Sequence, residues 1–194
     1  MSHALLQLRS RLVDVLRWLL RGKTDGRPKS DLIFLQNTGN YREFSRKLDE
    51  LGIPSDSVKR SAQLHARCWF DLARDHLADA KAAASLSRNR AAYSRSYYAA
   101  YNASKAVRYL HEGWVSLKGD DHGKAPELPD DFPSVDIWSA RITNLYRHRL
   151  RADYDNWSDS WTLQKSTVEE CVYQSEQFVE AARVYIEKTY SAKW

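Results

Sequence analysis

The chain of 194 residues is 43% apolar and 12% aromatic, which is enough to bury a core and excludes a globally disordered protein. Seven glycines and five prolines are few for this length, so long regular elements are favoured over loops. The formal net charge of +5 suits an anionic partner without requiring one, because net charge bears on association and not on fold.

Residues 4–21 predict an amphipathic helix, because apolar side chains recur at three- and four-residue steps between arginines. The apolar positions are Leu5, Leu8, Leu12, Val15, Leu16 and Leu19. This helix docks on the protein's own core, on a partner chain or on a membrane surface, in that order of preference. The charged residues leave neither a signal-peptide core nor an apolar span of about 20 residues, so we expect a cytoplasmic protein with no membrane partner.

Residues 22–60 show weaker patterns. Two glycines and a proline in residues 22–30 predict a linker, and residues 31–60 predict one or two short helices, the clearer one from Tyr41 to Leu51. We therefore divide the chain in two. Residues 1–60 hold the amphipathic helix, the linker and the short helices, and residues 61–194 form a helical domain.

Two long helices are predicted next. The first runs from about residue 57 to residue 86, with one predicted core face made of Leu64, Cys68, Leu72 and later alanines. The second runs from about residue 89 to residue 111, where tyrosines share one face and alanines allow close helix contacts. These tyrosines are Tyr93, Tyr97 and Tyr101.

Residues 118–133 hold three prolines and two glycines among polar residues and predict a loop. After the loop, Ser134 can cap a third helix that reaches about residue 154, and a fourth helix runs from about residue 162 to residue 190. No stretch alternates with a period of two residues. The sequence therefore predicts an all-α protein.

The two cysteines, Cys68 and Cys171, lie far apart within helical patterns. This spacing provides neither a disulfide framework nor a CxxC metal site. We therefore expect two small buried thiols.

The third long helix carries several arginines, which its periodicity separates. Projection at about 100° per residue places Arg149 near the middle of an apolar stripe, so this guanidinium points inward. Burying an unpaired charge costs several kcal/mol, and Asp153, one turn later, is the predicted partner. The same projection places Arg147 and Arg151 on the solvated face.

Arg141 and His148 lie about two turns apart on a flank beside that stripe. A guanidinium that can hold a phosphate through two hydrogen bonds, beside an imidazole that titrates near neutrality, suits phosphodiester chemistry. The alternative is purely structural: Arg149 and Asp153 form an internal ion pair that orients a core helix.

These segments, taken together, resemble the prokaryotic HEPN superfamily over about residues 60–190. The resemblance rests on the tyrosine- and alanine-rich segment 95–106, then Gly113, a polar loop with His122, and the ending Arg149-Leu-Arg-Ala-Asp-Tyr-Asp155. HEPN domains are helical bundles that commonly dimerise. The resemblance thus implies a HEPN-like bundle of four to five helices, with the N-terminal amphipathic helix as an addition, and a homodimer.

The resemblance implies RNA cleavage or RNA binding, often in toxin–antitoxin, antiphage or stress-response modules. Active members carry an Arg, usually followed by a polar residue, and then a His after four to six further residues. Two copies across the dimer form a metal-independent endoribonuclease site, where the His activates the ribose 2′-hydroxyl and the Arg stabilises the phosphorane. We therefore expect neither a metal ion nor a cofactor.

Two placements of that motif are available. If Arg149 is the family arginine, positions 154–156 hold Tyr, Asp and Asn and no His follows. Arg141 and His148 satisfy the spacing with six residues between them, but Ile142 replaces the polar residue. The candidate catalytic residues are therefore Arg141, His148 and Arg149, and the candidate substrate-binding or supporting residues are Asp153, Tyr154, Tyr97 and Tyr101.

Three functions stay open on this basis. The first is a HEPN endoribonuclease or toxin, and the second is a non-catalytic HEPN module that binds RNA, a nucleotide or a protein. The ending also resembles a branch without the His, whose members often sit beside a minimal nucleotidyltransferase, so such an enzyme or an antitoxin is an expected partner. The third is an interaction subunit that docks through its N-terminal helix.

Overall fold

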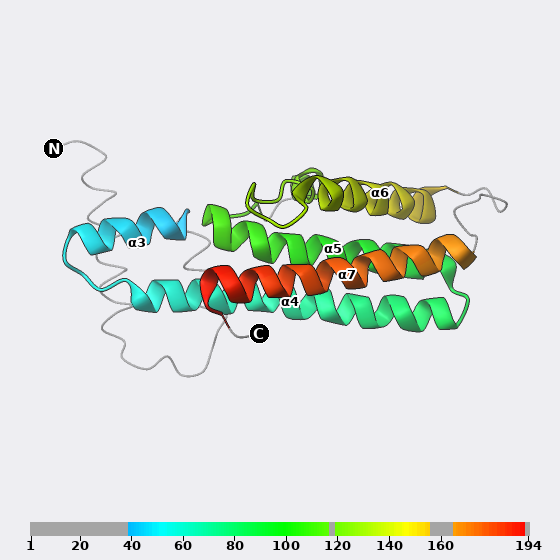
Figure 1. Cartoon of the computed structure of the whole chain (residues 1–194), viewed down its shortest axis with the longest axis horizontal. Helices are drawn as coiled ribbons and strands as arrows, with labels where there is room; N and C mark the ends of the chain where they lie inside the picture. The colour runs from blue at the N-terminus through cyan, green and yellow to red at the C-terminus, as the bar shows by residue number, and fades with distance from the viewer. Residues whose placement is uncertain (1–38, 117–118, 156–164, 193–194) are drawn as a thin grey trace.

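The structure is a computed structural model that describes residues 39–116, 119–155 and 165–192 (Figure 1). Within these ranges the chain forms five α-helices, one 3-10 helix and no β-strand, which confirms the all-α prediction. The elements are α3 (Tyr41–Glu50), α4 (Asp56–Ser85), α5 (Asn89–Glu112), η1 (Gly119–Lys124), α6 (Val135–Tyr154) and α7 (Lys165–Tyr190). The amphipathic helix expected at residues 4–21 and the linker after it lie outside the described residues.

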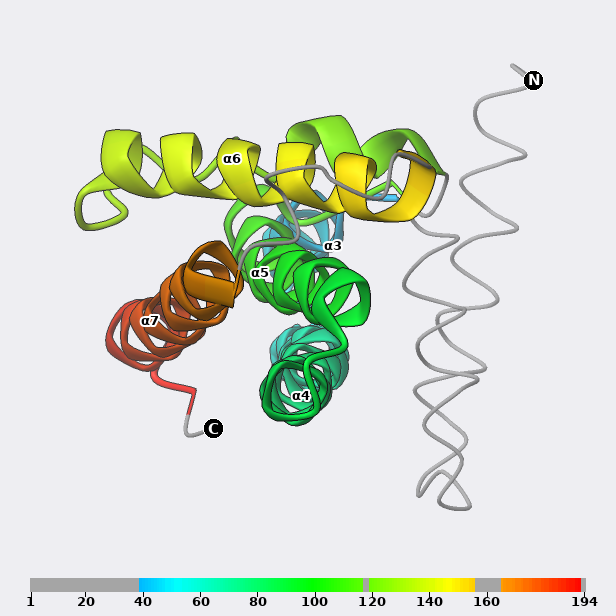
Figure 2. The same ribbon diagram turned by 90° about the vertical axis from the view of Figure 1, so that its right-hand side faces the viewer.

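Helix α5 is the centre of the bundle. Figure 2 views α5 nearly end on, with α4 below it, α6 crossing above it and α7 at its left. Five alanines of α5 are fully buried, and such small side chains allow neighbouring helices to approach closely. They are Ala92, Ala99, Ala100, Ala103 and Ala106. No helix of the described ranges covers the side of α5 that lies opposite α7 (Figure 2).

The start of α3 is fastened to the end of α5. The Asn40 side chain caps α3 by accepting from two backbone N–H groups, and its amide donates to the Glu112 carbonyl. Gly113 ends α5 with a φ of +89°, and a Cβ at this position would lie 2.0 Å from the Asn40 side-chain oxygen. Glycine is therefore required here both by backbone conformation and by the close approach of α3.

The core face predicted for α4 is wrong. Leu64 is 63% exposed, Leu72 is 41% exposed, and Cys68 is also exposed, whereas Cys171 is buried as expected. The buried face of α4 is instead built mostly from small residues, including Ala62, Ala66 and Ala73, together with Phe70 and His65. Alanines let α4 approach α5 closely, so the larger leucines are left on the outer side.

The core is aromatic where α4, α5 and α3 meet. His65 is 3% exposed, and its ring lies 4.2 Å from the Trp69 ring and 5.1 Å from the Tyr109 ring, measured between centroids. Burial lowers the pKa of His65 to about 4, and the nearby charge of Lys105 acts in the same direction.

None of the described helices is both long and apolar enough to cross a membrane.

We expect acid to destabilise the fold through His65. The pKa of this histidine is about 4 in the folded chain and 6.5 at its ordinary value, so its stabilising contribution is present above pH 6.5 and lost as the pH falls toward 4. The full loss corresponds to roughly 3 kcal/mol. Urea denaturation at pH 7 and pH 4.5 should show a smaller acid-induced loss for His65→Gln than for the wild type.

The control for this experiment is His111→Gln, since His111 is exposed at the end of α5. This variant should lose as much unfolding free energy in acid as the wild type. An acid-induced loss that is equal in all three proteins would contradict the role of His65.

Candidate functional site

Arg149 lies between α5 and α6 with its guanidinium held on several sides. Its side chain is 13% exposed, and Nε lies 2.8 Å from the Asp153 carboxylate, which confirms the predicted ion pair. One terminal nitrogen donates to the Tyr98 hydroxyl at 3.1 Å. The guanidinium carbon lies 5.6 Å from the Tyr98 ring centroid and 5.2 Å from that of Tyr154. The orientation of this cation is therefore fixed by both helices.

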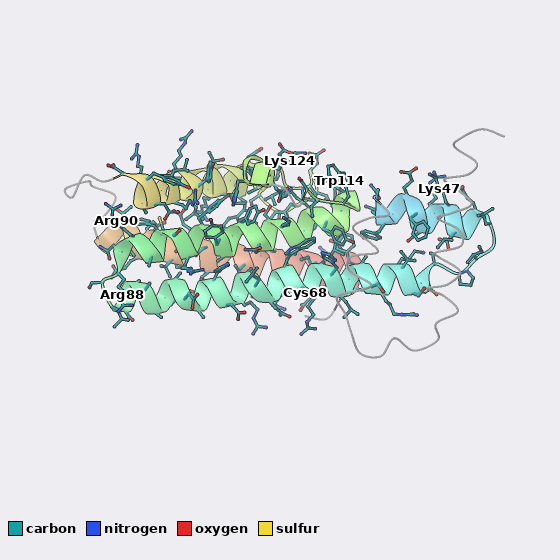
Figure 3. The ribbon with its side chains drawn as sticks, turned by 180° about the vertical axis from the view of Figure 1, so that it is seen from behind. Lys47, Cys68, Arg88, Arg90, Trp114 and Lys124 are labelled. Carbon is teal, nitrogen blue, oxygen red and sulfur yellow. The ribbon has the colours of Figure 1, made fainter. Side chains whose placement is uncertain are left out.

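The last turn of α6, which carries Arg149, is fastened to the first turns of α5. Arg90 donates to the carbonyls of Ala152 and Asp155, each at 2.7 Å, and so satisfies groups that a helix end leaves without partners. Figure 3 shows Arg90 at the start of α5, beside the end of α6. The Ser94 hydroxyl also donates to Asp153 at 3.2 Å.

His122 enters the same region from η1. Its Nδ1 lies 2.9 Å from the Tyr97 hydroxyl, and its ring stacks on Tyr101 with 4.5 Å between centroids. The ring centroid lies 5.9 Å from that of Tyr98, the tyrosine that accepts from Arg149. Burial lowers the pKa of His122, and the charge of Arg149 lowers it further. Both effects favour the neutral form of the His122 imidazole. We call Tyr98, His122, Arg149, Asp153 and Tyr154 the Arg149 site.

A buried ion pair holds η1 in this place. Asp121 is fully buried and accepts two hydrogen bonds from Arg108, both at 3.0 Å, and Arg108 is itself 1% exposed. Lys105 lies 3.3 Å from the same carboxylate, and the Tyr101 hydroxyl donates to it at 3.0 Å. Burial acts to raise the pKa of Asp121, but hydrogen bonds and charge from Arg108, together with Lys105, hold it below its usual value. Asp121 is thus an ionised carboxylate next to His122.

The other end of η1 is also fastened. Lys124 lies over the ring of Trp114, with 5.3 Å from Nζ to the ring centroid, and Figure 3 shows the two labelled residues close together. The Ser104 hydroxyl of α5 donates to the carbonyl of Ala125, directly after η1, at 2.6 Å. These contacts hold the end of η1 against α5 and the residue Trp114 that follows α5.

The structure brings most of the sequence-predicted site residues to one region. Arg149, Asp153 and Tyr154 are in direct contact, and Tyr154 is 71% exposed. Tyr97 is fully buried beneath His122, and Tyr101 links His122 to Asp121. Tyr97 and Tyr101 therefore support the site from below.

Arg141 and His148 have other surroundings. His148 is 6% exposed, and its ring stacks on Tyr93 with 5.4 Å between centroids, while burial lowers its pKa. Arg141 lies 4.9 Å over the Trp138 ring on the same helix. Neither of these ring contacts involves Arg149, and His148 faces the bundle interior. Arg147 and Arg151 are exposed, as the projection predicted.

Arg95 of α5 and His76 of α4 extend the contacts of Tyr98 toward α4. Arg95 lies 3.1 Å from the His76 ring nitrogen Nδ1, and the His76 ring lies 5.5 Å from that of Tyr98, between centroids. Arg95 has a side chain that is 45% exposed. Within the described ranges, no group of three or more His, Cys, Asp and Glu side chains could hold a metal ion.

A family model described as the HEPN domain matches residues 66–185 of the chain. This match confirms the resemblance predicted from the sequence, and it includes every residue of the Arg149 site and the Arg108–Asp121 pair. A HEPN domain suggests an RNA-related or nucleotide-binding function in general. No curated protein and no solved structure matches the chain.

We expect Asp121→Asn to destabilise the fold strongly. The substitution removes the only negative charge that faces Arg108 and Lys105 at this point of the described core, and an uncompensated buried charge costs roughly 3–5 kcal/mol. Urea denaturation measures the loss. The exposed pair of Arg46 and Glu50 supplies the control, since Glu50→Gln should cost less than about 1 kcal/mol. Equal losses in the two variants would refute a structural role for the buried pair.

Proposed function

The chain belongs to the HEPN domain family, and on this premise we propose that it binds single-stranded RNA at the Arg149 site. The observation that carries the proposal is the guanidinium of Arg149, which lies against the rings of Tyr98 and Tyr154 between α5 and α6. A fixed cation beside aromatic rings suits the two parts of a nucleotide, namely its phosphate and its base.

Arg149 keeps hydrogen-bonding capacity for a phosphate. A guanidinium has five N–H donors, which exceeds the number needed for Asp153, Tyr98 and Tyr154. The Asp153 side chain is 27% exposed, so a phosphate oxygen can approach the pair from solvent. Because Arg149 is already oriented, little side-chain entropy is lost when an anion binds.

Tyr154 supplies a stacking surface for a base. Its side chain is 71% exposed at the end of α6, and its ring is adjacent to the guanidinium. Stacking a base on an aromatic side chain contributes about 1–3 kcal/mol and tolerates any base. Single-stranded RNA offers such bases, whereas those of a duplex are already stacked.

The surroundings of the site favour a polyanion. Arg95 of α5, which contacts the His76 ring beside Tyr98, places further positive charge near the site. Contacts between such side chains and RNA phosphates release counterions, so binding should weaken as salt increases.

The proposed protein partners are a second copy of the chain, an antitoxin and a nucleotidyltransferase. These proposals rest on the family alone.

The second candidate function is metal-independent cleavage of the bound RNA. The sequence motif assigns this chemistry to Arg141, His148 and Arg149. For His148 to serve, its ring would have to leave the stack on Tyr93, where it is 6% exposed. Binding at the Arg149 site needs no such rearrangement, and for this reason it is the function we put first.

We expect Arg149→Gln to weaken RNA binding roughly tenfold or more, the equivalent of one charge-assisted hydrogen bond. Fluorescence anisotropy with a short labelled single-stranded RNA measures the dissociation constant, and 2′-O-methyl RNA keeps cleavage out of the assay. Arg147→Gln on the exposed face of the same helix is the matched control, with a change of less than about threefold. Unchanged affinity in a folded Arg149→Gln protein would refute the proposed site.

A further inference from the structure

We propose that His122 of η1, and not a histidine of α6, is the residue that takes the ribose 2′-hydroxyl proton at the Arg149 site. This inference rests on the proposed RNA binding and extends it to cleavage. The chain has no histidine at the motif positions after Arg149, and in this proposal η1 supplies the histidine instead.

The imidazole of His122 and the guanidinium of Arg149 flank one tyrosine. The Tyr98 hydroxyl accepts from Arg149 at 3.1 Å, and the Tyr98 ring centroid lies 5.9 Å from that of His122. The charge of Arg149 is also felt at the imidazole, where it lowers the pKa of His122. A phosphodiester held by Arg149 would therefore lie beside the same tyrosine that the imidazole contacts.

The hydrogen bonding of His122 leaves one ring nitrogen for a substrate. Nδ1 lies 2.9 Å from the hydroxyl of Tyr97, a tyrosine that is fully buried and cannot turn toward solvent. In the part of the chain that the structure describes, Nε2 contacts no hydrogen-bonding group of the protein. When Nδ1–H donates to Tyr97, Nε2 carries the lone pair that a general base requires.

His122 is held in position before any substrate arrives. Asp121, its neighbour in sequence, is anchored by Arg108 inside the core, and the imidazole ring is stacked on Tyr101. A catalytic group positioned in this way needs no rearrangement when the substrate binds. His148 offers the contrast, because it is stacked inside the bundle.

The cleavage step balances without a metal ion or a redox partner. His122 Nε2 takes the 2′-hydroxyl proton, the 2′ oxygen forms a bond to phosphorus, and the bond from phosphorus to the 5′ oxygen breaks. Water protonates the departing 5′ oxygen, and His122 returns its proton to water. Arg149 faces the negative charge that develops on the phosphoryl oxygens. The products are a 2′,3′-cyclic phosphate and a 5′-hydroxyl end.

The test compares cleavage and binding in the same full-length proteins. Wild type, His122→Gln, His148→Gln and His111→Gln are incubated with labelled single-stranded RNA in a chelator, and cyclic phosphate ends are identified by mass spectrometry. His122→Gln should cut at least about 100-fold more slowly while it binds 2′-O-methyl RNA within about threefold of the wild type. The exposed His111→Gln control should cut at the wild-type rate.

The outcomes separate this inference from the proposed function. Wild type that binds RNA without cutting it, or His122→Gln that cuts at the wild-type rate, overturns the role of His122 and leaves binding intact. If folded His148→Gln no longer cuts RNA while His122→Gln still cuts it, the chemistry belongs to α6, and the role of His122 is again overturned. Absence of both binding and cutting in the wild type overturns the proposed function itself.

A second variant covers the case in which His122→Gln does not fold. Tyr97→Phe removes only the hydroxyl that faces Nδ1 and keeps the buried ring. This variant should cut roughly tenfold more slowly with unchanged affinity for 2′-O-methyl RNA, because the imidazole loses the partner that fixes its tautomer. Cutting at the wild-type rate by Tyr97→Phe would then overturn the proposal.

Discussion

The buried ion pair between Arg108 and Asp121 is the constraint on which the site depends. Taking two charges out of water costs several kcal/mol, and their attraction offsets this cost only with good geometry and further hydrogen bonds. Here two parallel hydrogen bonds, Lys105 and the Tyr101 hydroxyl meet that requirement. The pair joins η1 to α5 at one point and so fixes where His122 lies. An apolar contact would hold η1 with less directional precision.

Three segments of the chain converge beside α5. Helix α5 contributes Tyr98, η1 contributes His122, and α6 contributes Arg149 together with Tyr154. Alanines of α5 bring the neighbouring helices close, and Arg90 fastens the last turn of α6. The packing of the bundle therefore determines where these polar groups lie relative to one another. This arrangement agrees with an RNA-related role for a HEPN domain.

Periodicity was sufficient to predict the long helices and the ion pair of Arg149 with Asp153, because both lie on one helix and follow from helical spacing. The core face of α4 was misplaced, since leucines such as Leu64 outrank alanines in any hydrophobic pattern, whereas close packing favours alanines. The role of His122 could not be predicted from the sequence. It depends on contacts between a loop and α5, and a loop has no period from which such contacts could be read.

The central claim is that His122 and Arg149 share one site, and their electrostatic coupling tests it most directly. The pKa of His122 can be measured by following its imidazole signals through a pH titration by NMR, in the wild type and in Arg149→Gln. Removing the neighbouring positive charge should raise the pKa of His122 toward its ordinary value, although burial continues to lower it. A pKa of His122 that is the same in both folded proteins would contradict the account.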